Sequence, residues 1–118
     1  MLKHCVFLNF KNDVPTGEKE AIMEGLASLV GVVDGMVAMS FGPNLDFEKK
    51  TPDFDYGFIV TFRDRNAHLA YETHEAHIEM GGRLVAACDG GVDGIVVFDV
   101  EVDMATKSAA PTNTGHDE

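Results

Sequence analysis

The chain begins with a strand-like run that carries apolar side chains on both faces, Leu2-Lys3-His4-Cys5-Val6-Phe7-Leu8-Asn9-Phe10. Successive side chains of a strand point to opposite faces, so Val6 and Leu8 share one face with His4. Cys5 and Phe7 lie on the other face. A strand that is apolar on both sides is central in its sheet or is covered by a partner. This run therefore predicts a sheet that buries both of its faces.

The segment from residue 15 to residue 34 has the pattern of an amphipathic helix. Pro15 and the residues after it are suited to a helix start, and Asp34-Gly35 is a stop signal. The apolar residues between them recur at three- and four-residue steps: Ile22, Leu26, Leu29, Val30 and Val33.

Three further strands and a second helix complete the pattern. The expected strands are residues 36–42, 54–62, where every second residue is aromatic or valine, and 95–102. Asp64 is suited to cap the second helix, which carries Tyr71, His74 and Ile78 on one stripe. We expect Gly81-Gly82 to interrupt this helix. The order β-α-β-β-α-β predicts an α+β, ferredoxin-like fold.

Two helices on one face of such a sheet leave the other face open. Cys5 and Phe7 would be exposed there, with half of the last strand, either Ile95 and Val97 or the alternate set that includes Phe98. Soluble monomers seldom expose an apolar patch of more than several hundred Å². The sequence therefore predicts a homodimer in which two sheets face each other and form a dimeric α/β barrel.

Length and composition bound the remaining possibilities. The chain has 118 residues, of which 45% are hydrophobic, and this predicts one domain over residues 1–103. Residues 104–118 lack apolar periodicity and are expected to form a disordered polar tail. Cys5 and Cys88 have neither a disulfide framework nor metal-site spacing, so we expect buried free thiols.

The charge of the chain argues against two classes of partner. The formal net charge is −11, from 20 acidic and 9 basic residues. Such a surface repels phosphate backbones and anionic headgroups, so neither nucleic acid nor membrane is an expected partner. Without a secretion signal or an apolar run of about 20 residues, the predicted location is cytoplasmic.

The densest chemistry lies in Tyr71-Glu72-Thr73-His74-Glu75-Ala76-His77, together with His4. Imidazole titrates near neutral pH, so two histidines and a tyrosine are suited to proton transfer. The alternative is that His4 is a hydrogen-bonded core histidine and Tyr71 a core aromatic. A zinc site from His4, His74 and His77 lacks a cysteine pair or a His-Glu-x-x-His arrangement, so we expect no metal and no cofactor.

Several landmarks, in order along residues 2 to about 102, resemble the stress-responsive A/B barrel (Dabb) family. The tyrosine and histidines of the central motif resemble the family signature Tyr-x-x-His-Pro-x-His. The other landmarks are the first strand with its Lys3-His4 pair, Phe41-Gly42, Asp55-Tyr56-Gly57-Phe58, Thr61-Phe62 and Val97-Phe98-Asp99. The resemblance implies a dimeric barrel of ferredoxin-like protomers.

The resemblance also implies roles for particular residues. The family includes olivetolic acid cyclase-like polyketide cyclases, which close a linear polyketide by intramolecular aldol condensation. There a strand-one histidine and the last signature histidine act as the acid–base pair, assisted by the tyrosine. These positions correspond to His4, His77 and Tyr71. We expect His74, Val6 and Phe58 to contact a ligand beside them.

One departure from the family pattern bears on this site. Glu75 stands where the family usually has proline, which would kink the helix and fix the direction of the last histidine. On a straight helix, residues six apart lie roughly 120° apart around the axis. Tyr71 and His77 would then diverge.

Three functions remain open at this point. The first is a homodimeric barrel that binds a small, partly apolar organic molecule in a pocket between helices and sheet, with histidine-based acid–base chemistry. The second is a cofactor-free polyketide cyclase or a small monooxygenase of electron-rich aromatics. The third is a non-enzymatic, stress-protective dimer in which the histidines only pack. A pocket lined by His4, Tyr71 and His77 would favour the first two.

Overall fold

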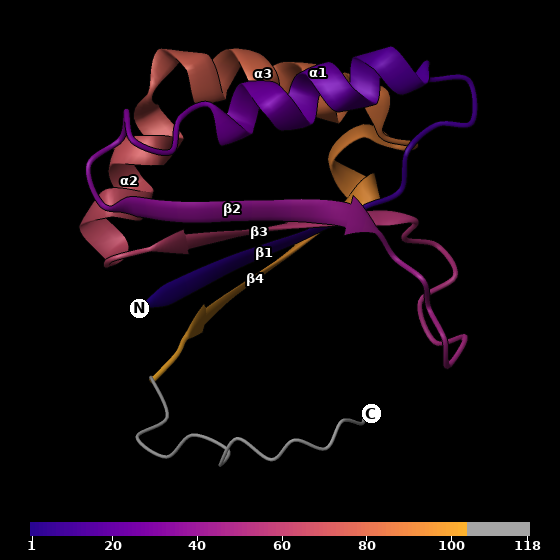
Figure 1. Ribbon diagram of the computed structural model, residues 1–118. Helices are drawn as coiled ribbons and strands as arrows, with labels where there is room; N and C mark the ends of the chain where they lie inside the picture. The colour runs from indigo at the N-terminus through magenta and orange to yellow at the C-terminus, as the bar shows by residue number, and fades with distance from the viewer. Residues whose placement is uncertain (104–118) are drawn as a thin grey trace, which may run out of the picture.

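The computed structural model describes residues 1–103, which form two layers (Figure 1). One layer is an antiparallel sheet of β1 (Leu2–Leu8), β2 (Met36–Pro43), β3 (Tyr56–Phe62) and β4 (Ile95–Glu101), in the order β2-β3-β1-β4. The other contains α1 (Thr16–Ala27), α2 (Arg65–Thr73) and α3 (Glu75–Ala87), and a 3-10 turn, η1 (Gly91–Gly94), leads into β4. The ferredoxin-like α+β prediction is confirmed. The predicted tail, residues 104–118, lies outside the described residues.

The first strand is central, as its two apolar faces predict. β1 pairs with β3 on one side and β4 on the other, so that Val6 lies opposite both Phe58 and Val97. In an antiparallel pair, residues directly opposite share a face. The same register places Asp99 of β4 beside His4 of β1 on the helix-covered face.

The core lies between the helices and this face. Its side chains come from the strands and from the inward stripes of α1, α2 and α3. The largest fully buried ones are Tyr71, Phe62, Leu8, Ile22, Met23, Leu26, Val60 and Cys88. Of the two cysteines, Cys88 is buried and Cys5 is partly exposed on the open face, and both are free thiols.

The first helix is shorter than its apolar stripe predicted. α1 ends at Ala27, and residues 28–34 continue as turns in which the amide of Val33 donates to the carbonyl of Leu29. Leu29 and Val33 are still buried, whereas Val30 is exposed. The apolar stripe therefore predicted in part which residues are buried, but not where the helix ends. Gly35, with a φ of +85°, then leads the chain into β2, and a Cβ there would lie 2.6 Å from that of Ala67.

The second predicted helix is broken at a different place from the one expected. It divides at His74, whose ψ of 137° is extended, and the Gly81-Gly82 pair lies inside α3. The His74 ring caps α3, because its Nδ1 accepts a hydrogen bond from the amide of Ala76 at 3.1 Å. The two glycines cost about 1 kcal/mol each relative to alanine. α3 packs against α1 and carries an Arg83–Glu18 ion pair at 2.6 Å.

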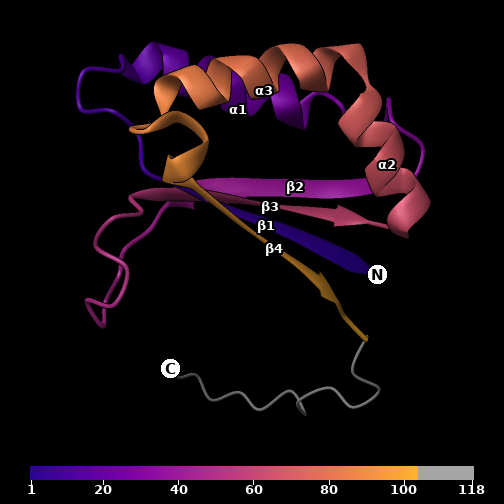
Figure 2. The ribbon, with the colours of Figure 1, turned by 180° about the vertical axis from the view of Figure 1, so that it is seen from behind.

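The other face of the sheet carries no helix, as Figure 2 shows from behind. On β4 the alternate set Val96, Phe98 and Val100 lies here beside Cys5 and Phe7, because Phe98 pairs with Cys5 and Val96 with Phe7. Phe98 is 56% exposed and Ile59 of β3 is 38% exposed. The predicted apolar open face is therefore present in the protomer. Within residues 1–103, no helix is long and apolar enough to cross a membrane.

Candidate functional site

The fold brings together three side chains from three different elements. His4 reaches from β1, Tyr71 from α2 and His77 from α3. The ring centroids of His4 and Tyr71 are 6.2 Å apart, and those of Tyr71 and His77 are 4.3 Å apart. Tyr71 thus lies within reach of both histidines and also contacts Phe62 of β3, at 5.1 Å between centroids.

The direction of His77 follows from the break in the helix. With α2 ending at Thr73, His77 lies in the first turn of α3 and its ring turns back to Tyr71. Its Nδ1 donates to the backbone carbonyl of Glu72 at 3.2 Å, so the neutral ring carries its lone pair on Nε2. Burial lowers the pKa of His77 below its ordinary 6.5, outweighing the carbonyl contact that favours its protonation. Glu75 therefore does not make His77 diverge, because the His74 cap breaks the helix without proline.

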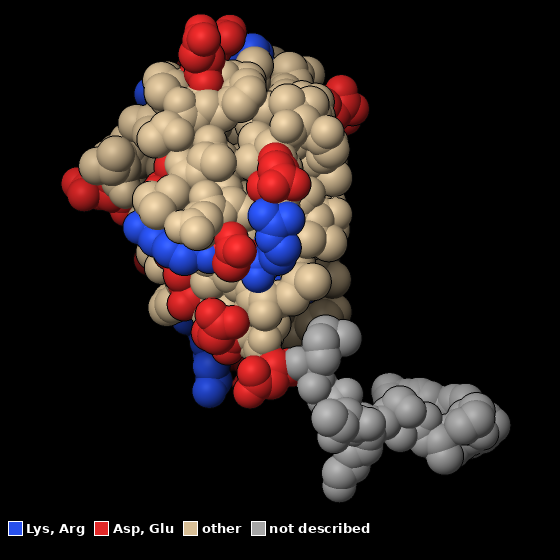
Figure 3. Space-filling model, turned by 90° about the vertical axis from the view of Figure 1, so that its left-hand side faces the viewer, with Lys and Arg blue, Asp and Glu red and all other residues tan. Residues whose placement is uncertain are grey.

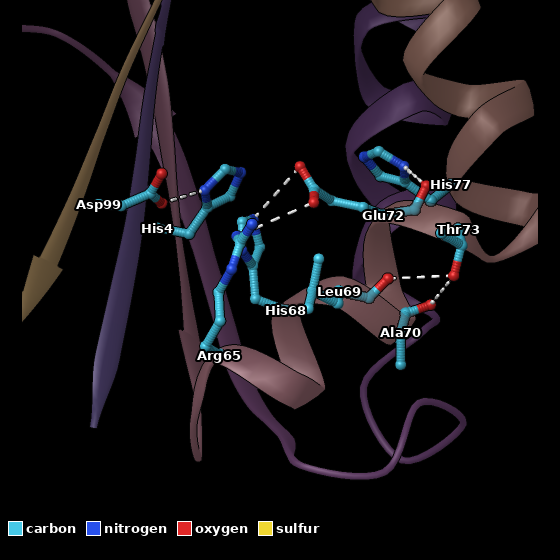
Figure 4. A network of polar contacts seen from close by, with 9 residues as sticks. All are labelled: His4, Arg65, His68, Leu69, Ala70, Glu72, Thr73, His77 and Asp99. Carbon is cyan, nitrogen blue, oxygen red and sulfur yellow. Dashed lines mark hydrogen bonds and ion pairs between the residues drawn. The ribbon is translucent and has the colours of Figure 1, made fainter.

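His4 is oriented by a carboxylate of the neighbouring strand. Its Nδ1 lies 2.6 Å from Oδ1 of Asp99, and since a carboxylate only accepts, Nδ1 carries the proton. The neutral His4 ring then presents its Nε2 as a base. The Asp99 carboxylate would stabilise the imidazolium formed when His4 takes up a proton. Figure 4 shows this pair on the sheet and His77 on α3, with His68 and Glu72 of α2 between them in this view.

Tyr71 contributes a hydroxyl that the protein itself does not use. The side chain is fully buried, and its hydroxyl has no hydrogen-bond partner among the described residues. Burial, and next the nearby Glu72 carboxylate, raise the pKa of Tyr71 well above its ordinary range, so the phenol stays protonated. An unpaired buried polar group costs roughly 1–3 kcal/mol.

His68 belongs to the same cluster, and our reading of the sequence missed it. It lies on α2, three residues before Tyr71, and its ring packs 4.7 Å from that of His4 and 5.3 Å from that of Phe62. Its residue exposure is 2%. The signal that could have found it is the three-residue spacing to Tyr71, which places both side chains on one helix face.

The other predicted ligand contacts are placed differently. His74 caps α3 through its ring, and no aromatic contact joins it to the cluster of His4, Tyr71 and His77. Val6 and Phe58 are each 3% exposed and pack in the hydrophobic core. Their contact with a ligand stays a prediction.

A metal-like arrangement does occur among His4, His68 and Asp99, whose candidate ligand atoms all lie within 4.8 Å of one another. However, Arg65 lies 2.5 Å from Nδ1 of His68, and a guanidinium can only donate. Nδ1 of neutral His68 is therefore the acceptor, and its Nε2 keeps the proton. A protonated nitrogen cannot ligate a metal, so His68 offers a hydrogen-bond donor.

Two surface hollows lie away from the histidine–tyrosine cluster. One of about 310 Å³ is lined by Phe7, Phe41 and Leu45 among others, and one of about 240 Å³ by Phe7, Phe54 and Phe98 among others. Both are at the open face and at the loop that joins β2 to β3. Neither is lined by His4, Tyr71 or His77, and the Tyr71 side chain between the two histidines is fully buried.

Charged side chains of both signs lie together over the end of the molecule that carries α2 (Figure 3). Arg63 pairs with Asp34 at 3.1 Å and Arg65 approaches Glu72 at 3.9 Å. Such exposed pairs contribute little stability. The Arg65–Glu72 pair matters here because both residues also approach His68.

The strand order and the open sheet face define a ferredoxin-like α+β protein with a buried histidine–tyrosine cluster. The family model of the stress responsive A/B barrel domain matches residues 2–102, and the chain belongs to this family.

Individual relatives agree with this assignment. A stress-response A/B barrel domain-containing protein of Arabidopsis thaliana is 27% identical over 93% of this chain and 94% of its own length. Olivetolic acid cyclase of Cannabis sativa is 25% identical over 68% of this chain and 79% of its own. A crystal structure from Jannaschia, described as a dimeric ferredoxin-like protein of unknown function, is 41% identical with a TM-score of 0.75. That match covers 86% of this chain and 98% of the Jannaschia chain.

Proposed function

We propose first that the protein is a homodimer whose two sheets cover each other's open faces. Two observations support this assembly. Phe98, Ile59 and Val100 are exposed on the open face. The similar Jannaschia protein is described as dimeric. Burial of apolar surface contributes roughly 25 cal/mol per Å², which is the driving force for such an association.

We propose further that each protomer binds a small, partly apolar carbonyl compound at the cluster of His4, Tyr71 and His77. The observation that carries this proposal is the Tyr71 hydroxyl, which is buried without a partner beside two histidines. A ligand carbonyl oxygen is the acceptor that this donor lacks. The apolar rest of such a ligand suits the rings of Phe62 and Tyr71 that line the cluster.

The chemistry that this arrangement supports is proton abstraction next to the carbonyl. Nε2 of His4 takes the α-proton, and the C–H electron pair moves into an enolate. Tyr71 donates a hydrogen bond to the developing enolate oxygen, and the Asp99 carboxylate stabilises the imidazolium of His4. The enolate then recovers a proton or attacks a second carbonyl, as in an aldol condensation. His77 stays neutral beside Tyr71 because burial lowers its pKa.

Hydrogen–deuterium exchange at the α-carbon of acetophenone, followed by NMR in D₂O, tests this step directly. The wild-type protein should accelerate exchange. His4→Gln should lower the rate of catalysed exchange about a hundredfold relative to wild type, since it removes the base. Tyr71→Phe should slow exchange at least about tenfold, because the enolate loses its donor. Tyr56→Phe is the matched control, since Tyr56 packs against Phe10 outside the cluster.

A second candidate function is a non-enzymatic dimer, and it is favoured by the burial of Tyr71. Tyr71 is fully buried, and the two hollows at the open face are lined by other residues. In that case wild-type exchange equals that of buffer, and acetophenone does not shift the melting temperature. The cyclase alternative shares the proton-abstraction step. The monooxygenase alternative is favoured by no feature of residues 1–103.

A further inference from the structure

His68 has a polar atom that neither the fold nor the chemistry above employs. The side chain is 3% exposed, and its Nε2 has no hydrogen-bond partner within the described part of the chain. Because Arg65 donates to Nδ1, the neutral ring carries its proton on Nε2. Burial, and next the proximity of His4, lower the pKa of His68, which keeps the ring neutral at physiological pH. His68 therefore presents a fixed, buried N–H donor.

Two unpaired donors consequently lie in one ring cluster. His68 and Tyr71 both pack against Phe62, at 5.3 and 5.1 Å between centroids. His68 and Tyr71 are three residues apart on α2, so their side chains lie on one helix face. Buried polar groups are paired in the great majority of cases, so two unpaired donors on this face indicate a missing acceptor. Donors that converge on one oxygen are the usual means of stabilising an oxyanion.

One carboxylate of the protein approaches Nε2 of His68. Oε2 of Glu72 lies 3.7 Å away, too far for a hydrogen bond, and the same carboxylate lies 3.9 Å from Arg65. Glu72 is 45% exposed on its side-chain atoms, so it can move aside without leaving a hole in the core. Figure 4 shows its carboxylate between His68 and His77 in this view.

We propose that the N–H of His68 and the hydroxyl of Tyr71 together form a two-donor subsite for an anionic oxygen of the ligand, an enolate or a phenolate, and that the Glu72 carboxylate covers this subsite until the ligand displaces it. This inference rests on the proposed function and names its substrate class, a carbonyl compound that enolises or a phenol. Arg65 orients the ring of His68 and adds positive charge beside the subsite.

The probe for this subsite is 4-nitrophenol, whose phenolate is coloured. Nitrobenzene is the matched compound, because it lacks only the phenolic hydroxyl group. Binding to the full-length protein should favour the phenolate and lower the apparent pKa of the bound phenol. His68→Leu should weaken phenolate binding about tenfold and leave nitrobenzene binding unchanged. His68→Gln should restore part of the affinity, because its amide N–H can lie near the position of Nε2.

Glu72→Gln should change the affinity in the opposite direction. It removes the competing carboxylate, so phenolate binding should become several-fold tighter. Glu75→Gln removes the same charge from the exposed start of α3 and should have a much smaller effect. If Glu72 were only a structural partner of His68, Glu72→Gln would lower the melting temperature without tightening binding, and that outcome overturns the proposal.

Two further results separate the inference from the function on which it rests. Equal phenolate affinity in wild type and His68→Leu, with α-exchange still accelerated, overturns the His68 subsite alone. No binding of either probe together with no α-exchange overturns both. If His68→Leu does not fold, ¹⁵N spectra of the wild-type imidazoles decide. The proposal requires His68 protonated on Nε2 and a downfield shift of that proton when 4-nitrophenol saturates the protein.

Discussion

The two faces of the sheet differ in burial although the strands alternate in the same way on both. On the helix-covered face Val6 is 3% exposed and Leu8 is fully buried, whereas on the open face Phe98 is 56% exposed. The helix-covered face also holds the polar cluster, at the end where α2 crosses it. One face is thus complete within the protomer, and the other is complete only in the assembly that we propose.

The largest expected effects come from placing a charged residue on either face of the sheet. Val6→Asp should unfold the protomer, because it buries an unpaired carboxylate at a cost of about 3–5 kcal/mol. Phe7→Asp, one residue along on the open face, should leave the protomer folded and dissociate the dimer. Light scattering at micromolar concentration and circular dichroism distinguish the two results.

Val32→Asp is the control for this pair, since Val32 is an exposed apolar residue in the turn after α1. It should change neither the mass in solution nor the fold. A wild-type protein that scatters as a monomer contradicts the assembly. A Phe7→Asp protein that remains a dimer contradicts the choice of the open face as the interface.

The sequence predicts the sheet well because the pattern of side chains on a strand is local. The two apolar faces of residues 2–8 correctly predicted that β1 is central. Which alternate residues of β4 face the open side could not be predicted, because this depends on the register of β4 against β1. The break at His74 was not foreseen, because a side-chain cap there outweighs the helical stripe. The stripe of α1 likewise continued past Ala27 into buried turns.

The site could be predicted only in part, for a similar reason. His4, Tyr71 and His77 were expected to converge because they lie on elements that flank the presumed helix–sheet pocket and because their positions match the family pattern, and their roles stay predictions. His68 was missed although its partners Arg65 and Glu72 lie three residues before it and four after it on the same helix. Asp99 was missed as the partner of His4 because their contact depends on the β1–β4 register.

The second prediction concerns the pH dependence of stability, to which the helix-covered face contributes through its histidines. Burial lowers the pKa of both His68 and His77 below the ordinary value of 6.5. The unfolded chain therefore binds protons at these sites before the folded one does, as the pH falls through 6.5. Protonation favours unfolding, so their stabilising effect is present above pH 6.5 and declines below it.

Thermal unfolding of wild type and of the double variant His68→Gln/His77→Gln, measured at intervals from pH 7.5 to 5.5, checks this prediction. The difference between the two curves removes the contribution that the carboxylates make to both proteins. The melting temperature of the wild type should fall by several degrees more than that of the double variant. Parallel curves would contradict the prediction, because they would show that the pKa values of the two histidines do not differ between the folded and unfolded states.

The smallest expected effect is that of Glu75→Pro, which tests whether the His74 cap alone fixes the direction of His77. Glu75 is the first residue of α3, where proline is favoured because its φ is preset and no amide is needed. His74 already has the extended conformation that a following proline requires. The gain of roughly 0.4–1 kcal/mol from a stiffer unfolded chain is offset by loss of an acidic residue at the helix N-terminus, worth about 0.3–1 kcal/mol. We therefore expect a melting temperature within a few degrees of wild type and unchanged α-exchange. A large gain in exchange would mean instead that the cap leaves His77 misdirected in the native chain and that proline corrects it.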